Sequence, residues 1–179
     1  MATKGGKKCG TSLPVVLDLR PDGRIVRGIK IRAAIPSDAA VIADFNVRMA
    51  WETEGLRLDP EVVRRGVAAV LEDGNKGIYY VADADGEVVG QLMITYEWSD
   101  WRNGNLWWIQ SVFVKEAYRG RGVFRALFEH LEKLARASDG VAGLRLYMHA
   151  ENDHARRTYG RLGMKPTSYE VLEMDFARK

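Results

Sequence analysis

Hydrophobic and polar residues follow two different periods along this chain, which predicts strands and helices in succession. Residues 29–32 alternate apolar and polar side chains, as a strand with one buried face does. A helix is then predicted over 38–54. Asp59 and Pro60 supply an N-cap and a first helical residue, which predicts a second helix that ends near residue 72.

The middle of the chain changes to the two-residue period of strands. Strands are predicted over 77–82 and 87–97, joined by a turn that contains Asp85-Gly86, a dipeptide typical of hairpins. Residues 107–114 form a continuous apolar run, which indicates a strand buried on both faces. From Val123 onward the apolar residues recur every three or four positions, and this spacing predicts an amphipathic helix.

The remaining segments complete the predicted order of elements. A strand is expected over 144–149, a helix over 153–162 and a last strand over 169–176. The order β-α-α-β-β-β-α-β-α-β predicts a mixed α/β (α+β) domain built around one sheet, over 29–179. Before it, residues 1–28 are expected to form a leader, in which Pro21-Asp22-Gly23 would turn a short hairpin.

Composition narrows the class of protein. The chain has 179 residues, 46% of them hydrophobic and 28% charged, which is ordinary for a globular protein with one core. No apolar run approaches the roughly 20 residues that cross a bilayer, and the N-terminus lacks the features of a secretory signal, so a cytoplasmic protein without a membrane span is expected. A net charge of +3 suits an anionic ligand but is too weak to require nucleic acid. No Cys or His pairs stand at metal-ligand spacing, so no metal is predicted.

A glycine-rich turn stands where the strand 107–114 gives way to the next helix. It is Arg119-Gly120-Arg121-Gly122, followed directly by Val123. The first turn of a helix has backbone N–H groups without partners and the positive end of the helix dipole, so an anion is the natural ligand. Arg-Gly sequences also occur in RNA-binding tails, but such tails lack the helical stripe that follows here.

A second strand-to-helix junction carries another spaced set of residues. Asn152 begins it, Tyr159 lies seven residues later, and Gly163 is placed to end the helix. Seven residues are about two helical turns, so Asn152 and Tyr159 are expected on the same side of the helix, lining one cleft.

Together these two motifs resemble those of the GNAT superfamily of acetyl-CoA-dependent N-acetyltransferases. The acyl-CoA motif of that family, Arg/Gln-x-x-Gly-x-Gly/Ala, is similar to 119–124, although Phe124 stands where Gly or Ala is usual. Its Asn-x-x-Ala-x-x-x-Tyr-x-x-x-Gly pattern matches 152–163 in register. The resemblance covers about 29–176, and it implies a mostly antiparallel mixed sheet of about six to seven strands flanked by about four helices.

The resemblance also implies where acetyl-CoA binds. The pyrophosphate would lie on the N–H groups of 120–125, and the pantetheine arm would pair with the edge of Val112 and Val114, where this strand separates from the next. The residues implied in binding the cosubstrate are Val112, Phe113, Val114, Arg119, Gly120, Arg121, Gly122, Val123, Phe124, Arg125, Asn152 and Arg156.

Acetyl transfer from a thioester to an amine needs a polarised carbonyl, a deprotonated amine and a proton for the leaving thiolate. By resemblance, Tyr159 gives that proton. A phenol, with an ordinary pKa of about 10, can act as an acid toward a thiolate, whose conjugate thiol has a pKa near 8.5. A backbone N–H near Val112 would polarise the carbonyl.

The acceptor is expected to be a primary amine of a small molecule or, as the alternative, of a protein. Residues 96–104 resemble the spermidine/spermine and thialysine N-acetyltransferases, but Gln110-Ser111 replaces the acidic pair of that subgroup, which argues against a polyamine. Trp98, Gln110 and Ser111 are predicted to contact the acceptor, and Glu97 to act as the base. The other candidate bases are Glu52, Glu54, Asp100 and His149.

Three functions therefore stand at the sequence level. The first is an N-acetyltransferase, the second is a module of the same fold that senses acyl-CoA without catalysis, and the third is RNA binding. Homodimers are common in the superfamily, so a second copy of the chain is also an expected partner.

Overall fold

Five strands lie side by side in the order in which they occur in the chain. The computed structural model describes residues 28–176, so the hairpin predicted around Pro21 lies outside the described residues. Strands β1 to β4 are antiparallel to their neighbours, and β5 runs parallel to β4. The strands are β1 (Ile29–Ala33), β2 (Ile78–Ala84), β3 (Glu87–Ser99), β4 (Gly104–Val114) and β5 (Val141–Leu146).

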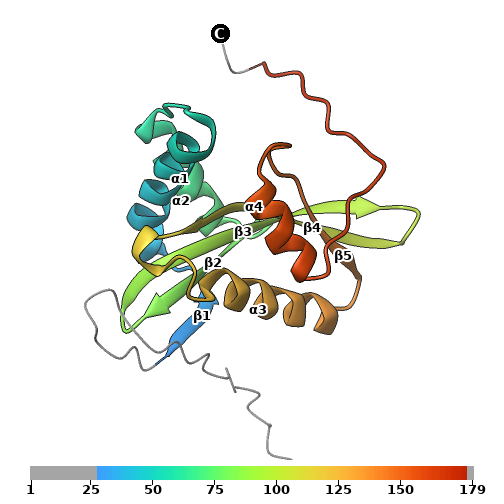
Figure 1. The fold of residues 1–179 in the computed structure, drawn as a ribbon, viewed down its shortest axis with the longest axis horizontal. Coiled ribbons are helices and arrows are strands. Elements are labelled where there is room, and N and C mark those ends of the chain that lie inside the picture. The colour runs from blue at the N-terminus through green and yellow to red at the C-terminus, as the bar shows by residue number, and fades with distance from the viewer. Residues whose placement is uncertain (1–27, 177–179) are drawn as a thin grey trace, which may run out of the picture.

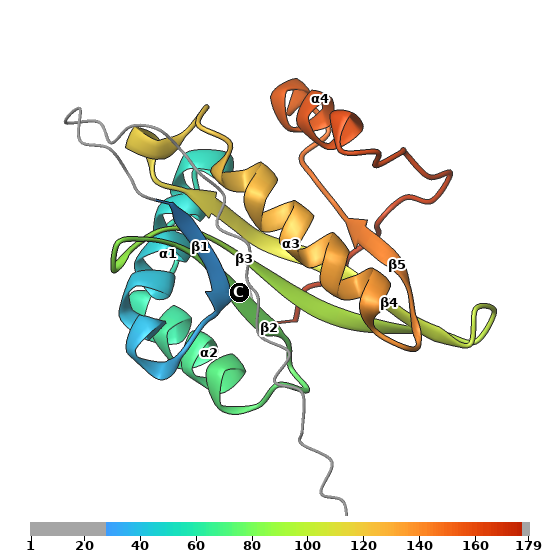
Figure 2. The same ribbon diagram turned by 90° about the horizontal axis from the view of Figure 1, so that it is seen from below.

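Four helices flank this sheet, as predicted. They are α1 (Ala39–Glu54), α2 (Pro60–Glu72), α3 (Val123–Ala137) and α4 (Asp153–Arg161), with 3-10 turns η1 (Pro36–Asp38) and η2 (Glu116–Tyr118). Helices α1 and α2 cover one face of the sheet and α3 crosses the other, whereas α4 lies beyond the end of β5 (Figure 1; Figure 2). No helix within residues 28–176 is long and apolar enough to span a bilayer.

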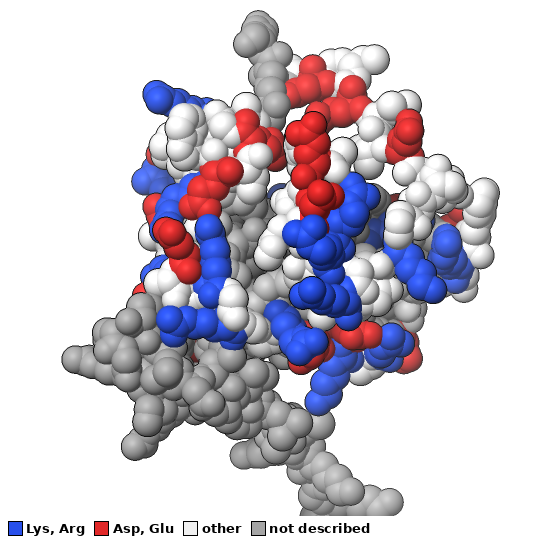
Figure 3. Space-filling view, viewed as in Figure 1, with Lys and Arg blue, Asp and Glu red and all other residues white. Residues whose placement is uncertain are grey.

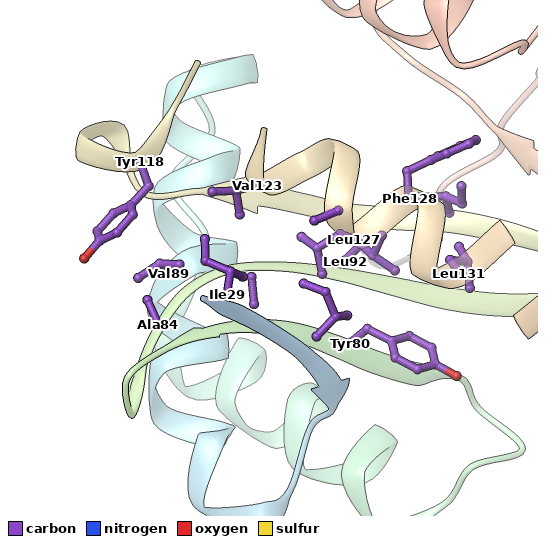
Figure 4. Close-up of a cluster of buried hydrophobic side chains, with 14 of the residues drawn as sticks. Ile29, Tyr80, Ala84, Val89, Leu92, Tyr118, Val123, Leu127, Phe128 and Leu131 are labelled. Carbon is purple, nitrogen blue, oxygen red and sulfur yellow. The ribbon is translucent and has the colours of Figure 1, made fainter. Parts of the chain in front are cut away.

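The two faces of the sheet hold two separate hydrophobic clusters. On one face, the stripe of α3 that begins at Val123 and continues through Leu127 and Leu131 packs over β1 to β3 (Figure 4). On the other face, Phe45 of α1 is fully buried and its ring lies 4.8 Å from that of Phe113 in β4. Helix α3 is thereby fixed against the sheet, and its first turn is held at the end of β4.

The hairpin between β2 and β3 forms where the sequence predicted it. Asp85 and Gly86 both have positive φ, 53° and 86°, as a two-residue type I′ turn requires. A short polar residue and a glycine tolerate that conformation, so the local sequence was sufficient to specify this turn.

Two strand predictions at the C-terminal end need correction. Strand β5 covers Val141–Leu146 instead of 144–149, because it pairs with β4 from Asn105 to Ile109. Residues 169–176 form no strand, so the sheet of the described chain has five strands instead of six or seven. Their side chains are mostly exposed, Leu172 at 92% and Phe176 at 88%. An alternating pattern makes a segment suitable for a strand, but only pairing with a neighbour makes it one.

Candidate active site

Strands β4 and β5 are neighbours over only half of β4. Their pairing ends at Ile109 and Leu146, and beyond that point the strands diverge (Figure 2). Within residues 28–176, no strand pairs with 110–114 on the β5 side. An edge of this kind presents backbone N–H and C=O groups at which an extended ligand can pair.

A bulge interrupts β4 where it leaves β5. Gln110 pairs with Met93 and Phe113 pairs with Gln91, so Ser111 and Val112 together face the single residue Leu92. Ser111 has a φ of 51°, a conformation that residues other than glycine seldom adopt. Strain of this type concentrates at functional sites, and here it changes the direction of the backbone at the free edge.

The first turn of α3 begins next to the end of β4. Gly122 is the N-cap residue, with a φ of 81°, and Gly120 has a φ of 72°. No side chain of the described residues caps this helix, and both glycines are exposed. An exposed helix start without a side-chain cap is the arrangement that an anion site requires.

The basic residues of this turn have different roles. Arg119 turns back toward the protein: its Nε donates to the carbonyl oxygen of Val114 at 2.9 Å, and its guanidinium pairs with Glu52 of α1. Arg119 therefore holds the turn against the protein, and these contacts leave its guanidinium less available to a phosphate. Arg125 is 67% exposed and lies 3.6 Å from Glu129. Lys and Arg side chains gather on the face that carries α3 and α4 (Figure 3).

Helix α4 begins differently. The Oδ1 atom of Asn152 accepts from the N–H of Ala155 at 2.9 Å, and the guanidinium of Arg156 donates to the carbonyl of Ala150 at 2.6 Å. The spacing between Asn152 and Ala155 thus has a structural purpose, because it closes the first turn of α4. The Nδ2 group of Asn152, a donor, can still meet a ligand.

Tyr159 connects α4 to α3. Its ring lies edge-on to that of Phe124, with 5.6 Å between the ring centroids, and Phe124 is the second residue of α3. Burial raises the pKa of Tyr159 above its ordinary value, so the phenol stays protonated at neutral pH. Phe124, where the family usually has a small residue, therefore fixes the proposed acid beside the proposed anion site.

A cavity of about 250 Å³ opens next to Tyr159. Its lining includes Leu146 at the end of β5 and Arg156 on α4. A larger hollow of about 580 Å³ lies between the C-terminal part of α3 and β5, but neither Tyr159 nor Gly122 lines it. The smaller cavity is lined by residues of the second motif, Arg156, Tyr159 and Gly160.

Glu97, the predicted base, is held in a cluster away from the bulge. Trp108 Nε1 donates to its carboxylate, and Arg145 lies 2.9 Å from it. Glu97 pairs across the sheet with Leu106, five residues before Ser111, which corresponds to roughly 16 Å along the strand. The structure therefore separates Glu97 from the bulge.

The predicted acceptor residues are divided in the same way. Gln110 and Ser111 lie at the bulge, where Gln110 Nε2 donates to Thr95 Oγ1 at 2.6 Å. Trp98 is 60% exposed, near the far end of the β3–β4 hairpin. Three polar residues that meet beneath the bulge, Asn46, Tyr79 and Gln91, were missed. The signal was present, because Gln91 interrupts an otherwise apolar run in 88–94.

Within the described residues, no group of three or more His, Cys, Asp or Glu side chains could hold a metal ion. The groups that this region offers to a ligand are backbone amides, a neutral phenol and a polar strand edge.

Comparison with known proteins gives matches to a family and to its fold. Residues 48–164 match the model of the acetyltransferase (GNAT) family. A possible acetyltransferase from Clostridium difficile 630 is 44% identical, with a TM-score of 0.79 over 84% of this chain and 99% of that one. A predicted acetyltransferase from Clostridium acetobutylicum, solved with acetyl-CoA, shares the fold, with a TM-score of 0.67 over 82% of this chain and 96% of that one, at 17% identity.

A curated relative gives a narrower match. An uncharacterized N-acetyltransferase of Methanocaldococcus jannaschii is 36% identical over 87 residues, which are 49% of this chain. The match spans about half, 52%, of the length of that relative. None of these three proteins is described as acting on a polyamine, so the comparison with the spermidine subgroup stays a prediction.

Proposed function

Because the chain belongs to the acetyltransferase (GNAT) family, we propose that it transfers acetyl from acetyl-CoA to a primary amine of a small molecule. The contact between Phe124 and Tyr159 carries this proposal, since it brings the first turn of α3 beside a half-buried phenol. The anion site would hold the pyrophosphate of coenzyme A, and the proton donor would protonate its thiolate as it leaves.

The residues present fit acetyl-CoA. The turn from Gly120 to Arg125 would hold the pyrophosphate through backbone N–H groups, and the edge of β4 from Val112 to Val114 would pair with the pantetheine arm. When bound, acetyl-CoA supplies the acetyl group as a thioester. The uncapped start of α3 and the unpaired edge of β4 support both assignments.

The chain then has two tasks at the thioester. The N–H of Val112, next to the bulge, would donate to the carbonyl oxygen as negative charge develops there. Tyr159 would donate its phenolic proton to the sulfur as the carbon–sulfur bond breaks. The raised pKa of Tyr159 supports this role, because the acid must be protonated before the step.

The acceptor nitrogen would attack the carbonyl carbon directly, in a ternary complex, so that a carbon–nitrogen bond forms as the carbon–sulfur bond breaks. The amine must therefore lose its own proton. Glu97 was predicted as the base, but its carboxylate already balances Arg145, and protonation would leave that guanidinium without its partner. We therefore expect that the amine proton leaves to water at the unpaired edge of β4. Glu97 would instead hold the side chain of Trp108 in place.

The class of acceptor is inferred from the two residues at the bulge. Gln110 and Ser111 are neutral, so they favour an amine that carries one positive charge over a polyamine. The cytoplasmic location and the homodimer remain predictions.

The test is release of free coenzyme A thiol from acetyl-CoA over a panel of small amines, amino acids, polyamines, aminoglycosides and peptides. Mass spectrometry should find an acceptor that has gained one acetyl group. The alternative, an acyl-CoA sensor, predicts that acetyl-CoA raises the melting temperature while no amine releases thiol. That result would overturn the catalytic proposal and keep the binding site.

A further inference from the structure

A chain of polar side chains, half-buried at Asn46 and buried at Tyr79 and Gln91, connects α1 to the bulge of β4. Gln91 of β3 is fully buried, and its Nε2 donates both to Asn46 Oδ1 at 2.7 Å and to the carbonyl oxygen of Ser111 at 3.3 Å. Asn46 Nδ2 in turn donates to the hydroxyl of Tyr79 at 3.0 Å. These groups lie at the hydrophobic cluster between α1 and the sheet.

Stability alone does not explain why a glutamine stands at this position. The Oε1 atom of Gln91 is buried and has no hydrogen-bond partner among the described residues. Turning the carboxamide around would not help, because its oxygen would then face the carbonyl of Ser111. A leucine or methionine would fill the same space without leaving a polar atom unpaired, so packing does not explain the glutamine.

What the glutamine supplies is a pair of donors in one fixed direction. One donor binds a helix and the other binds the residue with positive φ, so the bulge is held from the neighbouring strand. Burial raises the pKa of Tyr79, so its hydroxyl stays neutral at neutral pH and remains a stable partner of Asn46 there.

We propose that Gln91 is a positioning residue that clamps the β4 bulge through Ser111 and thereby aims the Val112 amide at the acetyl carbonyl. This inference rests on the proposed acetyl transfer. The clamp acts on an amide that matters as charge develops on the oxygen, so its loss lowers kcat and leaves the binding of coenzyme A intact.

The test compares Gln91→Met with Val81→Ala in the full chain. Val81 is also fully buried in the same cluster but makes no contact with the bulge through a polar group, so it controls for general weakening of the core. Gln91→Met should lower kcat by about tenfold or more, with the Kd for coenzyme A within about twofold of wild type. Val81→Ala should keep kcat within about twofold.

Amide hydrogen exchange provides a readout that does not depend on activity. In Gln91→Met the amides of Ser111 and Val112 should exchange faster than in Val81→Ala. If wild type transfers no acetyl to any amine, the proposed function fails, and this exchange still decides whether the clamp exists. Unchanged exchange at both residues, or an unchanged kcat in an active enzyme, would overturn the inference.

A second pair covers the case in which Gln91→Met does not fold. Asn46→Ala removes the anchor of the Gln91 carboxamide, whereas Asn46→Asp keeps an oxygen that accepts from Nε2. Asn46→Ala should lower kcat by about fivefold and Asn46→Asp should restore most of it. Equal kcat values in the two variants would contradict the clamp.

Discussion

The two helices that follow strand ends in this site begin in opposite ways. Helix α3 starts at Gly122, in a left-handed conformation and without a side-chain cap, whereas α4 starts at Asn152, whose side chain closes the first turn. Uncapped N–H groups need an external partner, and capped ones already have an internal one. We therefore propose that the first turn of α3 holds a ligand and that α4 holds Tyr159 in position.

The largest effect is expected when the acid itself is removed. Tyr159→Phe keeps the ring that packs on Phe124 and loses only the hydroxyl. We expect kcat to fall by about a hundredfold, with the Kd for coenzyme A unchanged, because the proton is needed only as the thiolate leaves. Steady-state kinetics and calorimetry measure the two quantities, and an unchanged kcat would remove Tyr159 from the mechanism.

A smaller effect is expected from the open helix start. Gly122→Ala places a side chain at a φ of 81°, which L residues adopt at a free energy of about 1–2 kcal/mol, so the turn should relax and coenzyme A should bind about tenfold more weakly. Gly66→Ala is the matched control, since Gly66 lies within α2 with nothing within 4 Å of the added carbon. Equal affinities in calorimetric titrations of the two variants would show that the turn does not bind the ligand.

The capped helix start predicts a different response. Asn152→Ala removes the acceptor of the Ala155 amide, which should lower stability by about 1 kcal/mol and kcat by several-fold, because α4 frays and Tyr159 loses its position. Asn152→Asp keeps an N-cap oxygen and should retain both stability and kcat. Thermal melts and kinetics distinguish these variants. A drop in coenzyme A affinity without loss of stability would instead make Asn152 a ligand contact.

Glu97 should contribute less than either helix start. Glu97→Gln keeps an oxygen for Trp108 and loses the charge that balances Arg145. We expect kcat to change by about threefold or less, since we propose that the amine proton leaves to water and not to Glu97. A fall of about a hundredfold, the usual effect of losing a general base, would return Glu97 to that role.

The smallest effect concerns pH. Because burial raises the pKa of Tyr159, the phenol is protonated below its ordinary value of about 10 and loses its proton only above it. The ratio of wild-type to Tyr159→Phe turnover cancels the titration of the amine. It should stay constant from pH 7 to about pH 10 and fall at higher pH. A ratio that declines near pH 8 would indicate an acid with a lower pKa.

The two junctions could be predicted because their signals are local. A strand followed by Gly120 and Gly122, and a strand followed by Asn152, each set the start of a helix within a few residues. The mixed, mostly antiparallel sheet that the resemblance implied was also confirmed, since short connections favour neighbouring antiparallel strands.

The features that were not predicted depend on contacts between distant residues. Serine has no special preference for positive φ, so nothing local marks Ser111 as a bulge. The clamp beneath it joins Asn46 to Gln91, 45 residues away. The alternation in 169–176 suits a strand. A strand forms only where a neighbouring strand pairs with it, and the periodicity of one segment does not reveal whether such a neighbour exists.

The most direct measurement is amide hydrogen exchange of the full chain with and without coenzyme A. Our account predicts that the ligand slows exchange of the N–H groups in the first turn of α3, from residue 120 to 125, and along β4 from residue 112 to 114. The first turn of α4 should exchange at the same rate in both samples. Protection confined to α4, or no protection at α3, would contradict the assignment of the anion site to α3.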